Sequence, residues 1–182
     1  MQANRELRVL VTDGNNRAAL AITRSLGRSG YTVFVAGEST STLAGASRYC
    51  KKRFVYSDPG RQPDRFREDI LHLVCQNQID ILMPAAEVTT CECMKVKEAF
   101  EGQCIVPFHS HQSVSQAASK HEVLQLARDL AIPMPATYFL HRPDDIAKAV
   151  HFGNRNGYPV VIKPSRSRSE ERRVGKECAT GC

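Results

Sequence analysis

The stretch Gly157-Tyr-Pro-Val-Val-Ile-Lys-Pro-Ser165 decides how the rest of the chain is interpreted. Its β-branched run follows a Gly-Tyr-Pro turn and predicts a short buried strand at 160–162, and Pro164 keeps Lys163 out of a helix. A lysine at the end of a buried strand is costly unless it meets an anion, and a nucleotide phosphate is an obvious candidate. The alternative from this stretch alone is a lysine that extends to water.

Two further motifs precede this stretch. Ser119-Lys120 opens a helix-like run, and Ala131-Ile-Pro-Met-Pro-Ala-Thr137 follows it. This order resembles the ATP-grasp superfamily, which has a lysine before a helix, then a GIPxPxT-like segment, then a G-Y/F-P-hydrophobic-K-P segment. The resemblance implies ATP as a cofactor, with Lys120 and Lys163 binding its phosphates. Mg²⁺ is implied with the nucleotide, but the family's glycine-rich loop, adenine segment and metal ligands are expected in a C-terminal part that this sequence lacks.

The residues before these motifs alternate between short apolar runs and amphipathic segments. Strands are predicted at 8–12, 32–36, 53–56, 79–83 and 104–107, and helices at 18–28, 63–76 and 88–100. This alternation predicts an α/β fold with a doubly wound parallel sheet and helices on both faces. A further strand at 137–140 and a helix from 143 to 152 are predicted after the sheet.

The resemblance divides the chain into four segments. It implies a Rossmann-like pre-ATP-grasp domain at 1–110, a connecting helix and linker at 111–136, and the start of a truncated ATP-grasp domain at 137–167. Residues 168–182 are interpreted as a non-native tail, because Arg168-Ser-Glu-Glu-Arg-Arg-Val-Gly-Lys-Glu-Cys178 resembles the in-frame translation of a sequencing adapter. The run is charged and holds one large apolar residue, so we do not expect it to pack.

Polar residues follow two of the predicted strands, at the edge where open α/β sheets bind ligands. In the family that the sequence resembles, the first of these loops often faces the acceptor substrate. The candidate substrate contacts are Asp13, Asn15, Asn16, Arg17 and Glu87. Two alternatives stay open: Asn16 as the N-cap of the next helix, and Glu87 in a first helical turn, stabilised by the helix dipole. The loop lacks the second and third glycines of a dinucleotide fingerprint, which disfavours NAD.

The resemblance implies an ATP-dependent ligase, similar to the carbamoyl-phosphate-synthase-like carboxylate-amine ligases. Such an enzyme activates a small-molecule carboxylate as an acylphosphate, which an amine or similar nucleophile then attacks. The two lysines would neutralise phosphate charge as it develops. We expect the chain to be an inactive N-terminal fragment of such an enzyme, and the sequence names no catalytic residue. A non-catalytic Rossmann-like module that binds a nucleotide or metabolite is the alternative.

Composition excludes several other classes. The net charge is +6 and the pI about 9.0, but no aromatic-rich basic surface accompanies the local cluster of Arg48, Lys51, Lys52 and Arg53, which predicts a solvated loop and not a nucleic-acid surface. Cys91 and Cys93 have no second pair at zinc spacing, so no metal site is predicted. The sequence shows no signal peptide and no stretch long enough to span a membrane, which predicts a cytoplasmic location.

Overall fold

A computed structural model of the chain describes residues 6–157 and 159–165, and the predicted tail at 168–182 lies outside them. The chain divides into two compact units, Met1–Val114 and Ser115–Cys182.

The first unit is built on a parallel sheet with the strand order β3-β2-β1-β4. Its strands are β1 (Arg8–Val11), β2 (Thr32–Gly37), β3 (Cys50–Val55) and β4 (Ile81–Met83). The fifth predicted strand at 104–107 is reduced to one parallel bridge between Ile81 and Ile105. Because the strands run in one direction, their carboxyl ends share one edge of the sheet.

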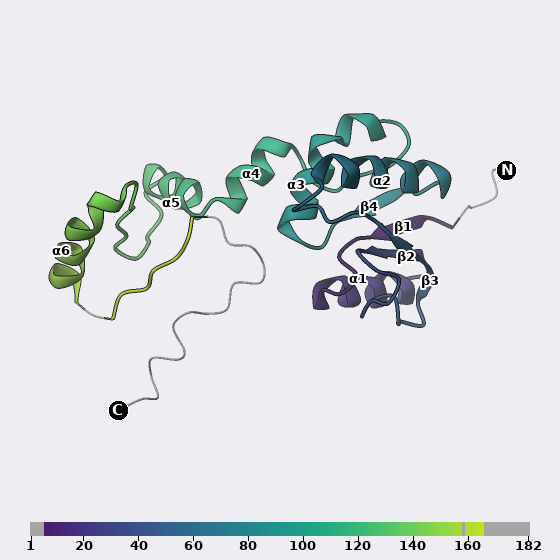
Figure 1. Cartoon of the computed structure of the whole chain (residues 1–182), viewed down its shortest axis with the longest axis horizontal. Coiled ribbons are helices and arrows are strands. Elements are labelled where there is room, and N and C mark those ends of the chain that lie inside the picture. The colour runs from purple at the N-terminus through teal and green to yellow at the C-terminus, as the bar shows by residue number, and fades with distance from the viewer. Residues whose placement is uncertain (1–5, 158, 166–182) are drawn as a thin grey trace, which may run out of the picture. The chain divides into compact units, whose positions relative to one another are not determined.

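Helices cover both faces of this sheet, as Figure 1 shows for α1 on one side and α2 with α3 on the other. These helices are α1 (Arg17–Arg28), α2 (Pro63–Gln76) and α3 (Glu87–Lys95). Alternate residues of β1 point to opposite faces, so Val9 and Val11 pack with Ala19 of α1 while Leu10 joins the cluster of Phe66 in α2. The predicted doubly wound arrangement is therefore confirmed.

The helix predicted at 88–100 is two elements. Helix α3 ends at Lys95, and a 3₁₀ turn, η1 (Lys97–Phe100), continues it and buries Phe100 in the core. Helix α4 (His111–Ala118) then leads out of the first unit.

The second unit contains α5 (Lys120–Asp129), the short 3₁₀ turn η2 (Pro143–Asp145) and α6 (Ile146–Asn156). The strand predicted at 137–140 and the buried strand predicted at 160–162 are both wrong. Neither segment has regular structure, and Val161 and Ile162 are 78% and 82% exposed. A β-branched run forms a strand only where a neighbour completes its hydrogen-bond ladder, and the described residues supply none for either segment.

A buried threonine holds the loop after β2 against the loop after β1. Ideal Cβ atoms built on Gly14, Gly37 and Gly45 would each lie within 3.0 Å of the Thr42 side chain. Backbone bonds on both sides of Gly14 fix this approach, since Gly14 N donates to Ala36 O at 3.0 Å and Ala44 N donates to Gly14 O at 2.7 Å. Neither loop can move away from the other without breaking one of these bonds.

Gly14→Ala is therefore expected to lower the free energy of unfolding by about 2 kcal/mol, as overpacking does at other closed sites. The new Cβ would lie 2.6 Å from Thr42 Oγ1 and 2.8 Å from Thr42 Cβ. Denaturant unfolding of Gly60→Ala is the control, because an ideal Cβ at Gly60 meets only an Asp58 carboxylate oxygen, at 3.3 Å. Equal stability of the two variants would contradict the close packing around Thr42.

Candidate functional site

Asp13 lies where the loop after β1 meets the loop after β4. Its Oδ2 accepts hydrogen bonds from Ala85 N and Ala86 N, both at 3.0 Å, and from Thr12 Oγ1 at 2.5 Å. Thr89 Oγ1 lies 2.6 Å from Asp13 Oδ2 and 2.9 Å from Ala86 O, and its single proton serves one of these acceptors at a time. The Asp13 carboxylate thus joins two loops that are more than seventy residues apart in the sequence.

Tyr56 supports Asp13 from the end of β3. Asp13 N donates to the Tyr56 hydroxyl at 3.0 Å, and this hydroxyl lies 3.5 Å from Asp13 Oδ1. Burial, and then the charge of the Asp13 carboxylate, raise the pKa of Tyr56 far above its usual range, so the hydroxyl keeps its proton. Asp13 itself has a positive φ of 59°, a conformation that Asp adopts more readily than most residues.

The other candidate substrate residues lie at the same edge of the sheet. Asn15 Oδ1 accepts from Leu43 N at 3.2 Å, and Asn16 Oδ1 accepts from Ala18 N at 2.9 Å as the N-cap of α1. Arg17 is exposed in the first turn of α1, and Glu87 is half-buried in the first turn of α3. The capping of α1 by Asn16 and the helical position of Glu87 are thus both observed, and their contacts with substrate stay predictions.

A lysine fixes the third loop at this edge, which follows the bridge at Ile105. Lys97 Nζ donates to Phe108 O at 2.6 Å and to His109 O at 3.0 Å. The sequence does not predict these roles of Tyr56, Thr89 and Lys97, because each acts through a residue that is distant in the sequence or through a backbone carbonyl. The Thr89-Thr90 pair after Pro84 was the one available signal, since hydroxyls in a first helical turn often bind backbone or side-chain acceptors.

The second unit brings the two lysine motifs together. Lys120 N donates to Ser165 O at 2.8 Å, and the hydroxyls of Ser119 and Ser165 lie 3.4 Å apart. Ser119 also caps α5, because its Oγ accepts from Glu122 N at 3.3 Å. Lys163 is exposed two residues before Ser165. The start of α5 and the segment that carries Lys163 are therefore neighbours, although Lys163 does not end a buried strand.

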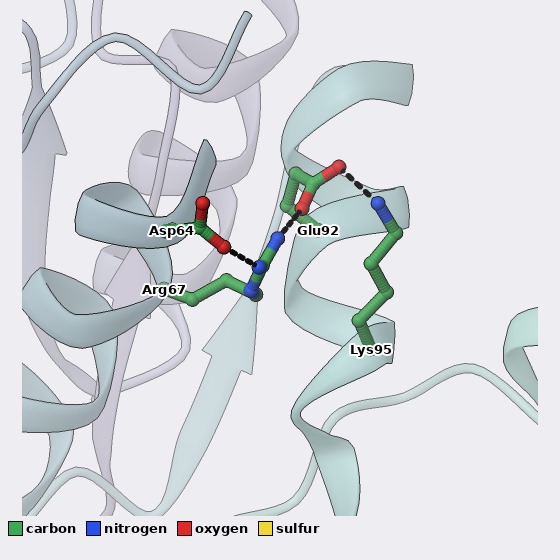
Figure 2. Close-up of polar contacts among 4 residues, drawn as sticks. All are labelled: Asp64, Arg67, Glu92 and Lys95. Carbon is green, nitrogen blue, oxygen red and sulfur yellow. Dashed lines mark hydrogen bonds and ion pairs between the residues drawn. The ribbon is translucent and has the colours of Figure 1, made fainter. Parts of the chain in front are cut away.

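A row of alternating charges joins α2 to α3 (Figure 2). Glu92 is 8% exposed, and its two carboxylate oxygens bind Arg67 Nη1 at 2.5 Å and Lys95 Nζ at 2.6 Å. Arg67 also pairs with the exposed Asp64. Burial alone would raise the pKa of Glu92, but the hydrogen bonds and charges of Lys95 and Arg67 outweigh burial and lower it.

Glu92→Gln is expected to reduce the free energy of unfolding by about 2 kcal/mol near neutral pH, between the values typical of exposed and of buried ion pairs. A carboxyl group whose pKa is lowered in the folded state stabilises that state above its unfolded pKa, and this contribution is lost as the pH falls through the folded value. The difference from the unsubstituted protein should therefore shrink below the ordinary Glu pKa of 4.5.

Urea unfolding over a range of pH measures this difference. Glu68→Gln is the control, because Glu68 is exposed on the same helix as Arg67. A Glu92→Gln deficit that stays constant as the pH falls would contradict the ion-pair explanation.

The described residues show neither a metal cluster nor a membrane span. Residues 6–157 and 159–165 contain no group of three or more His, Cys, Asp or Glu side chains that could hold a metal ion. No helix in that part of the chain is long and apolar enough to cross a membrane. None of the five described cysteines forms a disulfide with another described residue.

Comparison with known proteins finds relatives for both sequence and structure, although no protein-family model matches the chain. A probable alpha-L-glutamate ligase of Stutzerimonas stutzeri (strain A1501) is 33% identical over 86 residues, which cover 46% of this chain and 28% of the ligase. An L-amino acid ligase from Bacillus licheniformis superimposes with a TM-score of 0.68 at 17% identity, covering 97% of this chain and 40% of that enzyme.

A more distant structural neighbour is the biotin carboxylase domain of Hydrogenobacter thermophilus 2-oxoglutarate carboxylase. It has a TM-score of 0.58 and 16% identity, over 87% of this chain and 34% of that domain. The chain thus spans well under half the length of these proteins. The solved neighbours are ATP-grasp enzymes, and the chain has the α/β fold of their N-terminal region.

Proposed function

We propose that the chain is the N-terminal part of an ATP-grasp ligase that joins a carboxylate to an amine or similar nucleophile through an acylphosphate. In this proposal residues 1–110 form the pre-ATP-grasp domain, 111–136 connect it, and 137–167 begin the ATP-grasp domain. The similarity to an L-amino acid ligase and to a probable alpha-L-glutamate ligase supports amino acids as the small-molecule substrates. The predicted cytoplasmic location stays a prediction.

One observation carries the proposal: the Lys120 N to Ser165 O hydrogen bond brings together the two motifs whose lysines the resemblance assigns to ATP phosphates. A lysine binds phosphate as a point charge with three donors, so two of them near one place can hold a polyphosphate. A MgADP complex of one structural neighbour supports ATP and Mg²⁺ as the cofactors of the parent protein. When bound, the nucleotide supplies the phosphoryl group that activates the carboxylate, and we expect its metal ligands outside this chain.

The candidate substrate residues Asn15, Asn16, Arg17 and Glu87 belong to the same proposal, at the edge where Asp13 joins the loops after β1 and β4. Arg17 can pair with a substrate carboxylate, and Glu87 can accept hydrogen bonds from a substrate amine. Neither role requires the side chain of Arg17 or Glu87 to contact another described residue.

The test is ADP release by the full-length parent protein with Mg-ATP and pairs of L-amino acids that include L-glutamate. A ligase releases ADP at a rate that depends on both the carboxylate and the amine substrate. Reactions without the amine are the control for uncoupled hydrolysis. ATP binding without turnover for every pair would contradict the proposal and favour a non-catalytic nucleotide-binding module.

A further inference from the structure

Helix α3 is held in place by polar contacts to an unusual degree. Of its five buried residues, Thr89, Thr90 and Glu92 are polar, and only Cys93 and Met94 join the apolar core. Apolar packing is non-directional, whereas hydrogen bonds fix both distance and angle. The position of α3, and of Glu87 at its start, therefore depends on a few specific polar partners.

The N-terminus of α3 has its main partner outside the helix. Its N-cap, Ala86, has no side chain that could bind the free amides of the first turn. Asp13 supplies a carboxylate just before the helix: it accepts from the amides of Ala85 and of the N-cap Ala86, and from the Thr89 hydroxyl. A negative charge at this end of a helix also interacts favourably with the helix dipole.

The same contacts leave Asp13 little capacity to bind a ligand. Four donor atoms lie within 3.0 Å of its Oδ2, and its Oδ1 lies beside the Tyr56 hydroxyl. A carboxylate offers about four lone-pair sites over both oxygens, so most of its accepting capacity is used within the protein. Arg17 and Glu87 begin the two helices that follow the loops joined by Asp13.

We infer that Asp13 is a positioning residue for the substrate edge: it couples the loop after β1 to the start of α3, and so sets Glu87 relative to Arg17 without touching the substrate. This inference rests on the proposed ligase function for its effect on substrate. The structural part of the inference, the coupling of the two loops, depends only on the hydrogen bonds. Glu92 anchors the middle of the same helix to α2, at a separate point (Figure 2).

Thr89→Val and Thr90→Val form a matched pair for the test. Both replace a hydroxyl of α3 by a methyl group, and both hydroxyls lie near Ala86 O, but only Thr89 reaches Asp13. Asp13→Asn is the conservative variant, because it keeps the size of the side chain but replaces two charged acceptor oxygens by one weaker amide oxygen and an NH2 donor.

Hydrogen exchange of the unliganded chain measures the coupling directly. We expect the Ala85 and Ala86 amides to exchange at least about tenfold faster in Thr89→Val and Asp13→Asn, with unchanged protection in β1 and β2. Thr90→Val should leave the two amides protected. An equal loss of amide protection in Thr89→Val and Thr90→Val would overturn the inference, because it would show only that the helix is weakened. Unchanged protection in Asp13→Asn would also overturn it.

Kinetics of the parent ligase measure the consequence for substrate. Thr89→Val and Asp13→Asn should raise KM for the acceptor substrate about tenfold, since small displacements of positioning groups have effects of this size or larger, while KM for ATP stays within about twofold. Equal changes in both KM values would overturn the positioning role. An inactive parent would contradict the proposed ligase, and the exchange experiment would still decide whether Asp13 couples the loops.

Discussion

Asp13→Ala is expected to lower the free energy of unfolding of the first unit by about 3 kcal/mol, the largest stability change predicted for a single residue of this chain. Truncation removes the acceptor of the Ala85 and Ala86 amides and of the buried Thr12 and Thr89 hydroxyls. A buried donor without a partner costs about 1 to 3 kcal/mol, but some of these groups can relax toward water or other acceptors. For a unit of this size the change corresponds to a fall in Tm of roughly 10 °C.

Two further variants separate the causes of that loss. Asp13→Gly removes the same carboxylate but permits the positive φ of 59°, so it shows how much of the effect comes from backbone strain in alanine. Asp58→Ala is the control, because the contacts of the Asp58 carboxylate among the described residues stay within its own turn: Oδ1 accepts from Gly60 N and Arg61 N, and Oδ2 pairs with the exposed Arg61 side chain at 3.6 Å. Calorimetry of all three variants should place Asp58→Ala within about 1 kcal/mol of the unsubstituted protein. An Asp13→Ala variant as stable as this control would show that the two loops hold together without the carboxylate.

Local patterns were sufficient to predict the first unit. In β1, Val9, Leu10 and Val11 are all apolar, as expected of a strand covered on both faces, and the structure buries all three completely. Amphipathic segments between such strands allow few arrangements besides a doubly wound sheet. The carboxyl ends of β1 and β4 could be placed at one edge for the same reason, before any contact was known.

The role of Asp13 could not be predicted in this way. Its identity as a polar loop residue was visible, but its partners Ala85, Ala86 and Thr89 are determined by the strand order, which places β4 beside β1. A carboxylate that binds substrate and one that binds backbone amides look the same in a sequence. Glu92 presents the same difficulty, since its cationic partner Arg67 lies on another helix.

In the second unit the same local patterns predicted strands that do not form, and the reason is a different one. Val160, Val161 and Ile162 have high β-propensity, yet propensity measures how well a residue fits a paired and half-buried surface. Without a neighbouring strand among the described residues, the segment has no regular secondary structure and is exposed. Lys120 and Lys163 were found through the order of their motifs, which does not depend on strand pairing, and the Lys120 to Ser165 bond agrees with that order.

Lys163→Ala is expected to reduce kcat/KM for ATP in the full-length parent by at least about 100-fold, as the loss of one preorganised electrostatic group does in other enzymes. Charge on the phosphates increases as the phosphoryl group is transferred, so an ammonium group at this point stabilises the transition state more than the bound substrate. Lys120→Ala should have an effect of similar size. Because both lysines would act on one polyphosphate, the double variant should lose less than the product of the two single effects.

Lys148→Ala is the matched control in the same unit, since Lys148 pairs with Asp145 at 2.9 Å and is not assigned to nucleotide. It should keep kcat/KM within about threefold. The Lys148→Ala and Lys163→Ala variants should keep the Tm of the parent, because both lysines are exposed and exposed lysines contribute little to stability. Among residues 6–157 and 159–165 the chain supplies the two lysines and no loop that encloses a nucleotide, so calorimetry of the isolated chain with Mg-ATP should show weak binding at most. Sub-micromolar affinity of the isolated chain, or a Lys163→Ala parent as active as the Lys148→Ala control, would show that nucleotide recognition does not depend on Lys163 in the way proposed.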